Sequence, residues 1–508
     1  MLIFGGVLLA GLAFMVFSLN NDLAASHVAT PGQAALLLLG TALLAALAFE
    51  FVNGFHDTAN AVATVIYTNA LPPTVAVVWS GLWNFLGVLT ASGAVAYGII
   101  SLLPVELILQ ADSGAGFAMV FALLLAAIIW NLGTWWLGLP ASSSHTLIGS
   151  IIGVGVANQL MHYASGTSGV QWGKAQEIGL SLLISPLAGF LLAMLVLRLL
   201  MLLVKQPALY REPEGDAPPP LWIRGILVLT CTLVSFFHGS NDGQKGMGLI
   251  MLILIGVVPS AYALDRSMAQ SDVATIVAEA RATSAALAPA GGALSSDGRA
   301  ETMTFMQTRN VTPVTQPALA ALAGHVADDL ARYGRLDKVP ATAIRNLRSD
   351  MYLLSESLAL LEKTAPDALP ADATSHIKAL RTNMDGATRF IPNWVKMVVA
   401  LALGLGTMVG WRRVVQTVGE KIGNSGMTYA QGATAQMVAA GMIGAASGLG
   451  LPVSTTHVLS SGVAGTMVGS GNGVQGGTVK SMALAWVLTL PVAMLLSGSL
   501  FWLFNQLA

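Results

Sequence analysis

Long apolar stretches dominate this chain of 508 residues, and short polar motifs lie between them. A helix needs about 17 residues or more to cross a hydrocarbon core of roughly 30 Å. Stretches of that length occur near residues 2–19, 33–52, 75–100, 116–139, 176–204, 220–237, 246–264, 392–410, 429–449 and 480–505. Two shorter apolar pieces, 146–161 and 456–471, lie against polar motifs. The pattern predicts an all-α polytopic membrane protein.

Composition agrees with that prediction and excludes some classes of function. Hydrophobic residues make up 55% of the chain and charged residues 10%, and the mean hydropathy is +0.70. This hydrophobic composition predicts a membrane lipid bilayer as a partner. The net charge of −1 offers no basic surface, so we expect no nucleic acid as a partner. The single cysteine, Cys231, excludes intramolecular disulfides and cysteine-cluster metal sites. Residues 1–18 lack a basic start and an obvious cleavage site, which favours a retained helix over a cleaved signal peptide.

Charged residues of both signs appear between about 264 and 391, where the apolar pattern stops. Amphipathic periodicity there predicts a soluble, mainly helical insert over 265–391, and nothing in it resembles a site. The other predicted domains are an extra N-terminal apolar helix and linker (1–32), a first transmembrane repeat (33–204), a cytoplasmic linker (205–224), and a second transmembrane repeat (225–264 and 392–508).

Two pairs of polar motifs indicate a duplication. "FVNGFHD" at 51–57 and "FFHGSND" at 236–242 share Phe, Gly and Asp with an offset of 185 residues. "GLPASSSH" at 138–145 and "GLPVSTTH" at 450–457, named here the Ser/Thr motifs, share Gly, Leu, Pro, Ser and His with an offset of 312. The two offsets differ by 127 residues, close to the length of the insert, so one insertion explains both.

Positive charges near the span ends set the expected orientation. They are Lys205, Arg211 and Arg224 in the middle linker, and Arg412, Arg413 and Lys421 after the insert. Both loops are therefore predicted to be cytoplasmic, and the insert periplasmic or external. If the Ser/Thr motifs form two re-entrant helical hairpins at the midplane, each half crosses an odd number of times, and the halves form an inverted-topology repeat.

Each Ser/Thr motif places a proline and hydroxyl residues directly before an apolar piece rich in small residues. Ser and Thr are common N-caps, so we expect a helix to start there with its free N–H groups and dipole directed at a cavity. Two such helix starts would form an anion site. The hydroxyls could instead satisfy broken backbone or pack against a neighbouring helix. His145 and His457 are expected to brace the motifs rather than to bind ligand.

Asp57 and Asp242 would repel an anion unless a positive charge lies among them. A bound cation or a proton could supply it, and either would couple anion entry to ion entry. The alternative is a structural role as caps at helix breaks. The halves differ where Asn60 aligns with Lys245. We hypothesise that Lys245 replaces a mobile cation and leaves His56, Asp57 and Asp242 to handle a proton or a metal ion.

Six segments resemble hallmark motifs of the inorganic phosphate transporter (Pit) family, in particular its bacterial low-affinity phosphate symporters. They are "NGFHDTANAVATVIYT", "WNLGTWWLGLPASSSHTLIG", "HGSNDGQKGMGL", "GWRRVVQTVGEKIG", "GMTYAQGATAQM" and "LPVSTTHVLSSGVAGTMV". The resemblance covers nearly the whole chain, with less support over 1–18 and in the insert. It implies a multi-pass protein of the bacterial inner membrane that transports inorganic phosphate by symport.

The resemblance also implies roles for individual residues. Phosphate would lie between the two hairpins, bound by Ser142, Ser143, Ser144, Ser454, Thr455 and Thr456. Coupling ions would bind near Asp57, Asn60 and Asp242, a set that we extend to His56, Asn241 and Lys245. Supporting positions would be His145, His457, Asn84 and Gln436. Members of the family form dimers and move a transport domain against a scaffold, so a homodimer is expected.

Departures from the sodium-coupled pattern favour protons as the coupling ion. Sodium-coupled relatives carry Asn-Asp-x-x-Asn in both halves, whereas His56 replaces the first Asn of one copy and Lys245 the last Asn of the other. Sodium-coupled animal members also tend to have Glu where Asn84 and Gln436 lie. The subgroup is known to accept neutral metal–phosphate complexes, and Mg, Ca or Zn would lower the desolvation cost of phosphate. We expect no resident cofactor and no fixed metal.

The leading interpretation is a proton-coupled phosphate symporter, with sodium coupling as the alternative. A passive anion channel would also place two half-helices at the midplane. Asp57 and Asp242 argue against a channel, because they would block anion flux unless they were neutralised in each cycle. An enzyme with a Ser-His pair is disfavoured, since each His follows its Ser or Thr directly in the sequence and adjacent side chains diverge on a helix.

Overall fold

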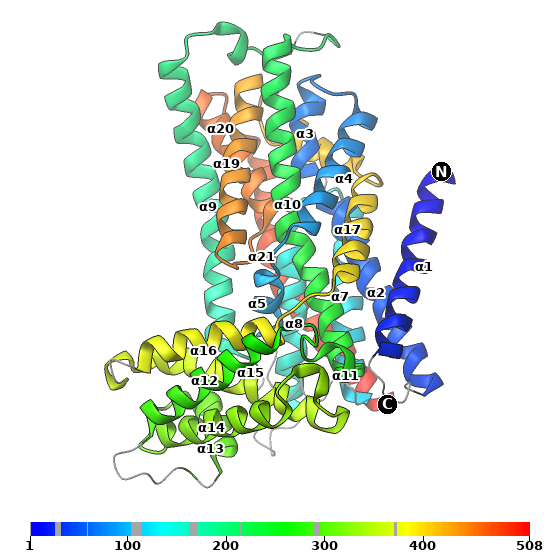
Figure 1. Cartoon of the computed structure of the whole chain (residues 1–508). Coiled ribbons are helices and arrows are strands. Elements are labelled where there is room, and N and C mark those ends of the chain that lie inside the picture. Colours follow the sequence, from blue (N-terminus) through cyan, green and yellow to red (C-terminus); the bar gives the residue numbers. More distant parts are fainter. Residues whose placement is uncertain are drawn as a thin grey trace. The chain divides into compact units, whose positions relative to one another are not determined.

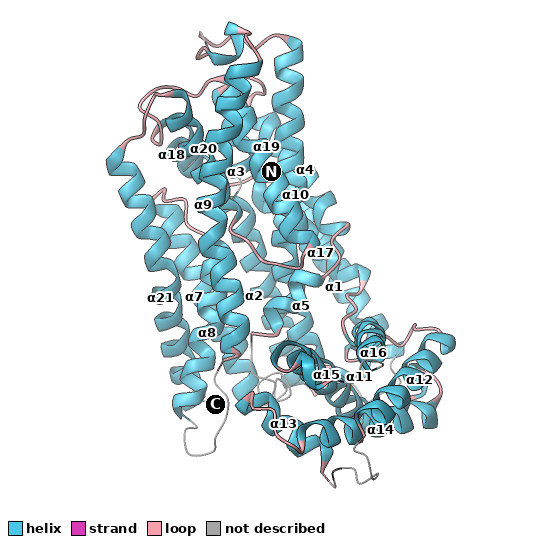
Figure 2. Cartoon of the chain, turned by 90° about the vertical axis from the view of Figure 1, so that its left-hand side faces the viewer, coloured by secondary structure: helices cyan, strands magenta, loops and turns pink. Residues whose placement is uncertain are grey.

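The computed structural model describes residues 2–25, 32–57, 59–102, 114–161, 170–213, 215–288, 295, 297–369 and 373–507. Within these ranges the chain is helical (Figure 1, Figure 2), and its only β-pairing is an isolated bridge between Gly423 and Val474. The all-α prediction is therefore confirmed for this part of the chain.

Two compact units divide the chain. The first contains Met1–Ser18, Leu36–Ile253 and Ile391–Ala508, and the second contains Leu19–Ala35 and Leu254–Phe390. Wholly or for most of their length, the helices of the first unit are α1 (Leu2–Ala25), α2 (Gln33–Asp57), α3 (Ala59–Tyr67), α4 (Pro73–Leu89), α5 (Ala94–Ile100), α7 (Gly114–Trp136), α8 (Ser143–Met161), α9 (Trp172–Leu203), η2 (Pro207–Tyr210), α10 (Leu221–Val257), α17 (Asn393–Thr407), α18 (Arg412–Glu420), α19 (Tyr429–Gly448), α20 (Thr455–Ser470) and α21 (Gly476–Leu507).

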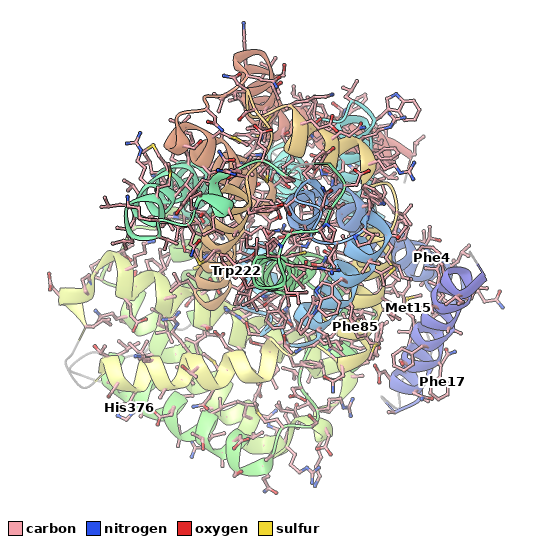
Figure 3. All side chains as sticks on the ribbon, turned by 90° about the horizontal axis from the view of Figure 1, so that it is seen from above. Phe4, Met15, Phe17, Phe85, Trp222 and His376 are labelled. Carbon is pink, nitrogen blue, oxygen red and sulfur yellow. The ribbon has the colours of Figure 1, made fainter. Side chains whose placement is uncertain are left out.

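Six helical segments of the described chain are long and apolar enough to cross a membrane. They are Ile3–Ala25, Gln33–Tyr67, Gly116–Trp136, Trp172–Leu203, Leu221–Val257 and Gly476–Leu507. The number rises to eight if each of two bent helix pairs counts as one span; α4 and α5 form one of these pairs, with a bend of 76°. Large apolar side chains are exposed on these helices, and Figure 3 labels Phe17 and Trp222, which are 63% and 50% exposed. Such a surface suits lipid.

The course of α10 corrects one prediction. We expected 220–237 and 246–264 to be separate spans with the polar motif between them, but α10 runs from Leu221 to Val257 without a break. The polar residues do not interrupt the helix, because His238, Asp242 and Lys245 are spaced three or four residues apart and share one face.

Helices from opposite ends of the chain pack together in the first unit. α8 packs on α21, and α20 packs on α9. Glycine allows the backbones to approach closely, since a Cβ added to Gly153 would lie 2.1 Å from the Met494 carbonyl oxygen, and one added to Gly465 would lie 2.2 Å from that of Phe190. Figure 1 shows α10 between α4 and α19. This arrangement brings both Ser/Thr motifs and both Asp motifs into one helical bundle.

The second unit is a helical bundle with its own core. Its helices are α11 (Pro259–Tyr262), α12 (Gln270–Leu287), α13 (Gly298–Thr308), α14 (Thr315–Tyr333), η3 (Leu336–Lys338), α15 (Ala341–Thr364), η4 (Pro366–Ala368) and α16 (Ala373–Thr388). α12 packs on α14 and α16, and α13 packs on α14 and α15. Asp297 caps α13 by accepting the Ala300 N–H over 3.1 Å. Arg299 pairs with the buried Asp350 at 2.7 Å.

Candidate functional site

Two turns of the same design precede α8 and α20. Gly138 and Gly450 have φ values of +67° and +68°, a conformation that glycine adopts without strain. Four residues later, the Ser142 and Ser454 hydroxyls each accept the backbone N–H three positions ahead, over 3.2 and 3.1 Å. These N-caps start the two helices, so the local sequence of each Ser/Thr motif sets both the turn and the helix start.

The two Ser/Thr motifs contact each other directly. The Ser144 hydroxyl donates to the Val453 carbonyl oxygen over 2.8 Å. The rings of His145 and His457 lie with their centroids 4.5 Å apart, and Trp486 of α21 stacks on His457 at 4.2 Å. The Trp486 indole N–H also donates to the proline carbonyl of the first motif over 2.9 Å. A stack of three rings therefore braces the contact between the motifs.

Asp57 accepts hydrogen bonds from both motifs. The Ser143 hydroxyl donates to its Oδ2 over 2.9 Å, and the Thr456 hydroxyl donates to its Oδ1 over 2.6 Å. His56 Nδ1 lies 3.1 Å from Asp57 Oδ1, and His56 Nε2 lies 3.1 Å from the Thr134 hydroxyl oxygen. One carboxylate at the end of α2 thus joins the starts of α8 and α20.

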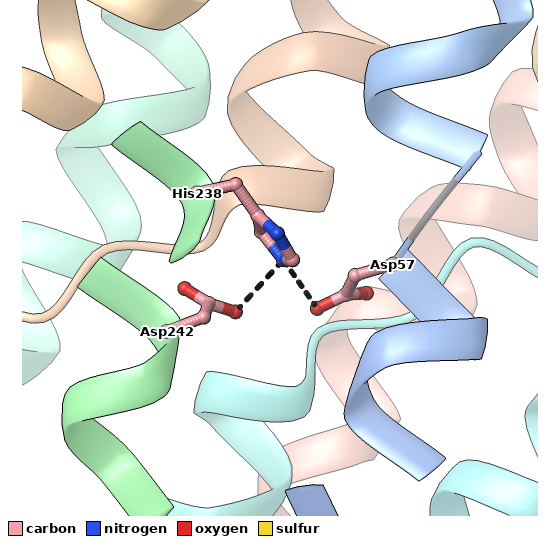
Figure 4. Close-up of side chains that lie close together, drawn as sticks. All are labelled: Asp57, His238 and Asp242. Atoms are coloured by element: carbon pink, nitrogen blue, oxygen red, sulfur yellow. Dashed lines mark ion pairs between the residues drawn. The ribbon is translucent and has the colours of Figure 1, made fainter. Parts of the chain in front are cut away.

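Asp242 lies beside Asp57 and contacts nitrogen atoms that can carry positive charge. Its Oδ2 is 2.7 Å from Lys245 Nζ and 3.5 Å from both His238 Nε2 and the Ser143 hydroxyl. His238 Nε2 also lies 3.9 Å from Asp57 Oδ2, so the imidazole stands between the two carboxylates (Figure 4). When protonated, it supplies the charge that two neighbouring carboxylates require.

The ionisable side chains of this cluster are buried. His56, Asp57, His238, Asp242 and Lys245 are all 2% exposed or less, and charges buried in this way are costly unless they are paired. Ligand atoms of Asp57, His238 and Asp242 lie within 4.8 Å of one another, a set that could hold a metal ion. The cluster can therefore bind protons or a cation next to hydroxyl groups that can bind an anion.

Of two further residues expected at the site, one contacts the buried ionisable cluster and the other does not. Asn84 contacts the cluster, since its Oδ1 accepts from His238 Nδ1 over 2.7 Å. Gln436 does not: it accepts the Thr230 hydroxyl and donates to the Ala61 carbonyl oxygen, both over 2.7 Å. Gln436 therefore braces α19 against α10 and α3.

The remaining expected residues lie at the edge of the site. Asn241 donates to the Ser447 hydroxyl and the Leu451 carbonyl oxygen over 3.1 and 3.2 Å, which ties α10 to the second Ser/Thr motif. The Thr455 hydroxyl is buried and has no hydrogen-bond partner among the described residues. The side chain of Asn60 lies outside the part of the chain that the structure describes.

The sequence patterns did not single out two buried residues, His238 and Glu50. His238 precedes Asp242 by four residues, a spacing that places both side chains on one face of a helix. Glu50 is fully buried within the apolar part of α2. An ionisable residue inside a membrane span indicates function by itself, and that signal would have found Glu50.

Comparison with known proteins assigns the chain to a family. A family model described as the phosphate transporter family matches residues 53–497. The low-affinity inorganic phosphate transporters PitA and PitB of Escherichia coli strain K12 are 45% and 43% identical to this chain, over 92% and 93% of it and 97% of each relative. A probable low-affinity inorganic phosphate transporter of Bacillus subtilis strain 168 is 26% identical, over 93% of this chain and 98% of its own length.

A solved structure of a sodium-dependent phosphate transporter shares the fold, with a TM-score of 0.51 at 21% identity, over 93% of this chain and 100% of that one. The relatives and the candidate spans together describe a multi-pass protein of the bacterial inner membrane. The match over residues 53–497 and the identity to PitA and PitB show that this chain belongs to the phosphate transporter (Pit) family.

Proposed function

We propose that this inorganic phosphate transporter is a secondary active symporter that couples phosphate to protons. Phosphate would lie between the two Ser/Thr motifs, where hydroxyl groups and the N–H groups at the starts of α8 and α20 can donate to its oxygens. We assign phosphate binding to Ser142, Ser143, Ser144, Ser454, Thr455 and Thr456.

The observation that carries this proposal is the convergence of Ser143 and Thr456 on the carboxylate of Asp57. Phosphate oxygens accept hydrogen bonds from the same kinds of donor as carboxylate oxygens. The hydroxyls that Asp57 engages are therefore donors that a phosphate would need, and Thr455 adds a buried hydroxyl without a hydrogen-bond partner. Phosphate would compete with Asp57 for them.

We further propose an inverted-topology repeat with two re-entrant hairpins. The helix order supports it, because α4, α5, α7, α8 and α9 are followed after the insert by α17, α18, α19, α20 and α21. The reciprocal packing of α8 on α21 and of α20 on α9 agrees with such a repeat. The proposed domains keep the bounds given above: 1–32, 33–204, 205–224, 225–264 with 392–508, and the insert 265–391.

Proton coupling is supported by the charges of the buried cluster. Lys245 pairs with Asp242 at 2.7 Å and so supplies a tethered positive charge where a mobile cation would otherwise neutralise the aspartate. His56 and His238 lie beside Asp57 and can each carry a proton. We assign coupling to His56, Asp57, Asn60, Asn241, Asp242 and Lys245, and supporting roles to His145, His457, Asn84 and Gln436.

A divalent metal ion would be cargo rather than a cofactor in this scheme. Mg, Ca or Zn bound to hydrogen phosphate cancels its charge and lowers its desolvation cost. Asp57, His238 and Asp242 offer oxygen and nitrogen ligands as such a complex passes. As the family resemblance implies, we also propose that the protein works as a homodimer.

The test is uptake of labelled phosphate into proteoliposomes that contain the full-length protein, with the pH gradient, sodium and magnesium varied independently. A proton symporter accumulates phosphate when only a pH gradient is imposed. Accumulation that requires sodium would replace protons with sodium as the coupling ion. Equilibration without accumulation under every gradient would identify a passive channel.

A further inference from the structure

Glu50 is a buried carboxyl group with little to hold it in the ionised form. It is 0% exposed in α2, and its Oε2 accepts one long hydrogen bond, from Asn53 Nδ2 at 3.5 Å. Its Oε1 has no hydrogen-bond partner in the described part of the chain. An ionised carboxylate in such surroundings costs far more free energy than a neutral carboxylic acid does. Glu50 therefore has the surroundings of a group that holds a proton.

The neighbouring helix leaves room for this carboxyl group. A Cβ added to Gly246 of α10 would lie 2.2, 2.5 and 2.6 Å from Cγ, Cδ and Oε1 of Glu50. Any larger residue at 246 would thus collide with the Glu50 side chain. Glycine at this position lets Glu50 reach α10 directly beside Lys245.

Among the described residues, the charged groups that interact electrostatically with Glu50 are Lys245, Asp242 and His238, and all three belong to α10. His56 and Asp57 lie further along α2 itself. Lys245 pairs with Asp242 at 2.7 Å, and among the described residues no ion pair within 4 Å joins it to Glu50. While Lys245 pairs with Asp242, it does not neutralise Glu50. A buried Glu50 without an ion-pair partner among the described residues requires a proton.

We propose that Glu50 is the binding site of the coupling proton, and that Lys245 alternates between Asp242 and Glu50 as that proton leaves and returns. The proposal rests on the proton symport proposed above. A carboxylate oxygen of Glu50 binds a proton from water on one side of the membrane. The resulting carboxylic acid releases that proton to water on the other side. The carboxylate left behind then competes with Asp242 for Lys245. Glu50 need not touch phosphate, because it lies about 10 Å along the helix from Asp57.

The experiment uses the full-length protein in proteoliposomes and compares two reactions. Exchange of labelled for unlabelled phosphate across the membrane needs no net proton movement, whereas accumulation driven by a pH gradient does. Glu50→Gln keeps the shape of the protonated side chain but cannot lose a proton. We expect this variant to keep exchange, and to lose both accumulation and phosphate-dependent proton entry, followed with an internal pH dye.

Two control variants make the outcome interpretable. Glu50→Asp retains a titratable group and should restore part of the accumulation. Thr41→Val alters an exposed polar residue of the same helix, whose hydroxyl donates to the Leu37 carbonyl oxygen, and should change neither reaction. If Glu50→Gln accumulates phosphate with wild-type proton entry, or loses exchange as well, the proposal is overturned. If the wild type itself moves no protons with phosphate, the proposed proton symport fails instead.

Discussion

Thr456 donates its hydroxyl hydrogen to Asp57 Oδ1 over 2.6 Å and thereby joins the start of α20 to the end of α2. A hydrogen bond to a charged group contributes about 1.5–3 kcal/mol, and Thr456→Val removes the donor at nearly constant volume. If phosphate uses the same donor, we expect KM for uptake to rise by about tenfold or more, since about 1.4 kcal/mol is a factor of ten. Thr456→Ser keeps the hydroxyl and is the matched control. Equal KM values for the two variants would contradict the assignment.

The ring stack predicts a second effect, on stability. His457 lies between His145 and Trp486, and each aromatic pair contributes about 0.5–1.5 kcal/mol beyond the area it buries. We therefore expect His457→Ala to lower the thermal unfolding temperature in detergent and to weaken phosphate uptake, because the motifs lose their brace. His457→Phe keeps a ring and should retain most of the stability. A Phe variant as unstable as the Ala variant would show that ring stacking is not what matters.

Lys245 predicts a change in ion dependence. Lys245→Asn removes the tethered charge that lies 2.7 Å from the buried Asp242 and leaves this carboxylate with His238 alone, at 3.5 Å, among its ion-pair partners in the described chain. A mobile cation then has to take that place, so we expect phosphate uptake to become dependent on sodium or another added monovalent cation. Lys245→Arg retains the charge and should keep the wild-type dependence. Uptake by the Asn variant with unchanged ion dependence would refute the tethered-cation role.

Gly246 and Glu50 predict a non-additive pair of substitutions. A Cβ at 246 would lie 2.2 Å from Glu50 Cγ, and overpacking of this kind costs about 1–3 kcal/mol. Gly246→Ala should therefore lower the free energy of unfolding. The same change in a Glu50→Ala background should cost much less, because the obstructing side chain is gone. A double-mutant cycle measures this coupling, and additive effects would exclude the contact.

Asp350 predicts a pH effect outside the membrane spans. Burial raises the pKa of this carboxyl group above its usual 3.8, although Arg299 and His325 oppose the shift. As pH rises from 3.8 towards the folded-state pKa, the folded state binds more protons than the unfolded state, so the free energy of unfolding falls. Hydrogen exchange of α15 in the full-length protein should show protection that falls with rising pH in the wild type, relative to Asp350→Asn. The opposite slope would contradict the shift.

Local features of the Ser/Thr motifs could be predicted because they depend on a few adjacent residues. Glycine permits the positive φ at 138 and 450, and serine four residues later caps the next helix. The sequence wrongly predicted two spans where α10 is one unbroken helix. A polar motif between two apolar stretches suggests the end of one helix and the start of another. Polar residues three or four positions apart, however, also fit one face of a single helix.

Contacts between distant helices could not be derived from the sequence. Three contacts depend on how α2, α8, α10 and α20 approach one another. They are the hydrogen bonds from both motifs to Asp57, the position of His238 between two aspartates, and the contact of Glu50 with Gly246. Neither hydrophobic periodicity nor motif spacing contains that information. The duplication predicted which residue types recur, but not which of them touch.

The double engagement of Asp57 has a consequence for leakage. If phosphate binds where we propose, Asp57 occupies the hydroxyls of Ser143 and Thr456 that the incoming anion would need. Phosphate would then have to displace Asp57 in order to bind, so binding of phosphate and release of the two hydroxyls would be one event. A transporter whose site opens only when its substrate binds lets few ions leak down the ion gradient that drives transport.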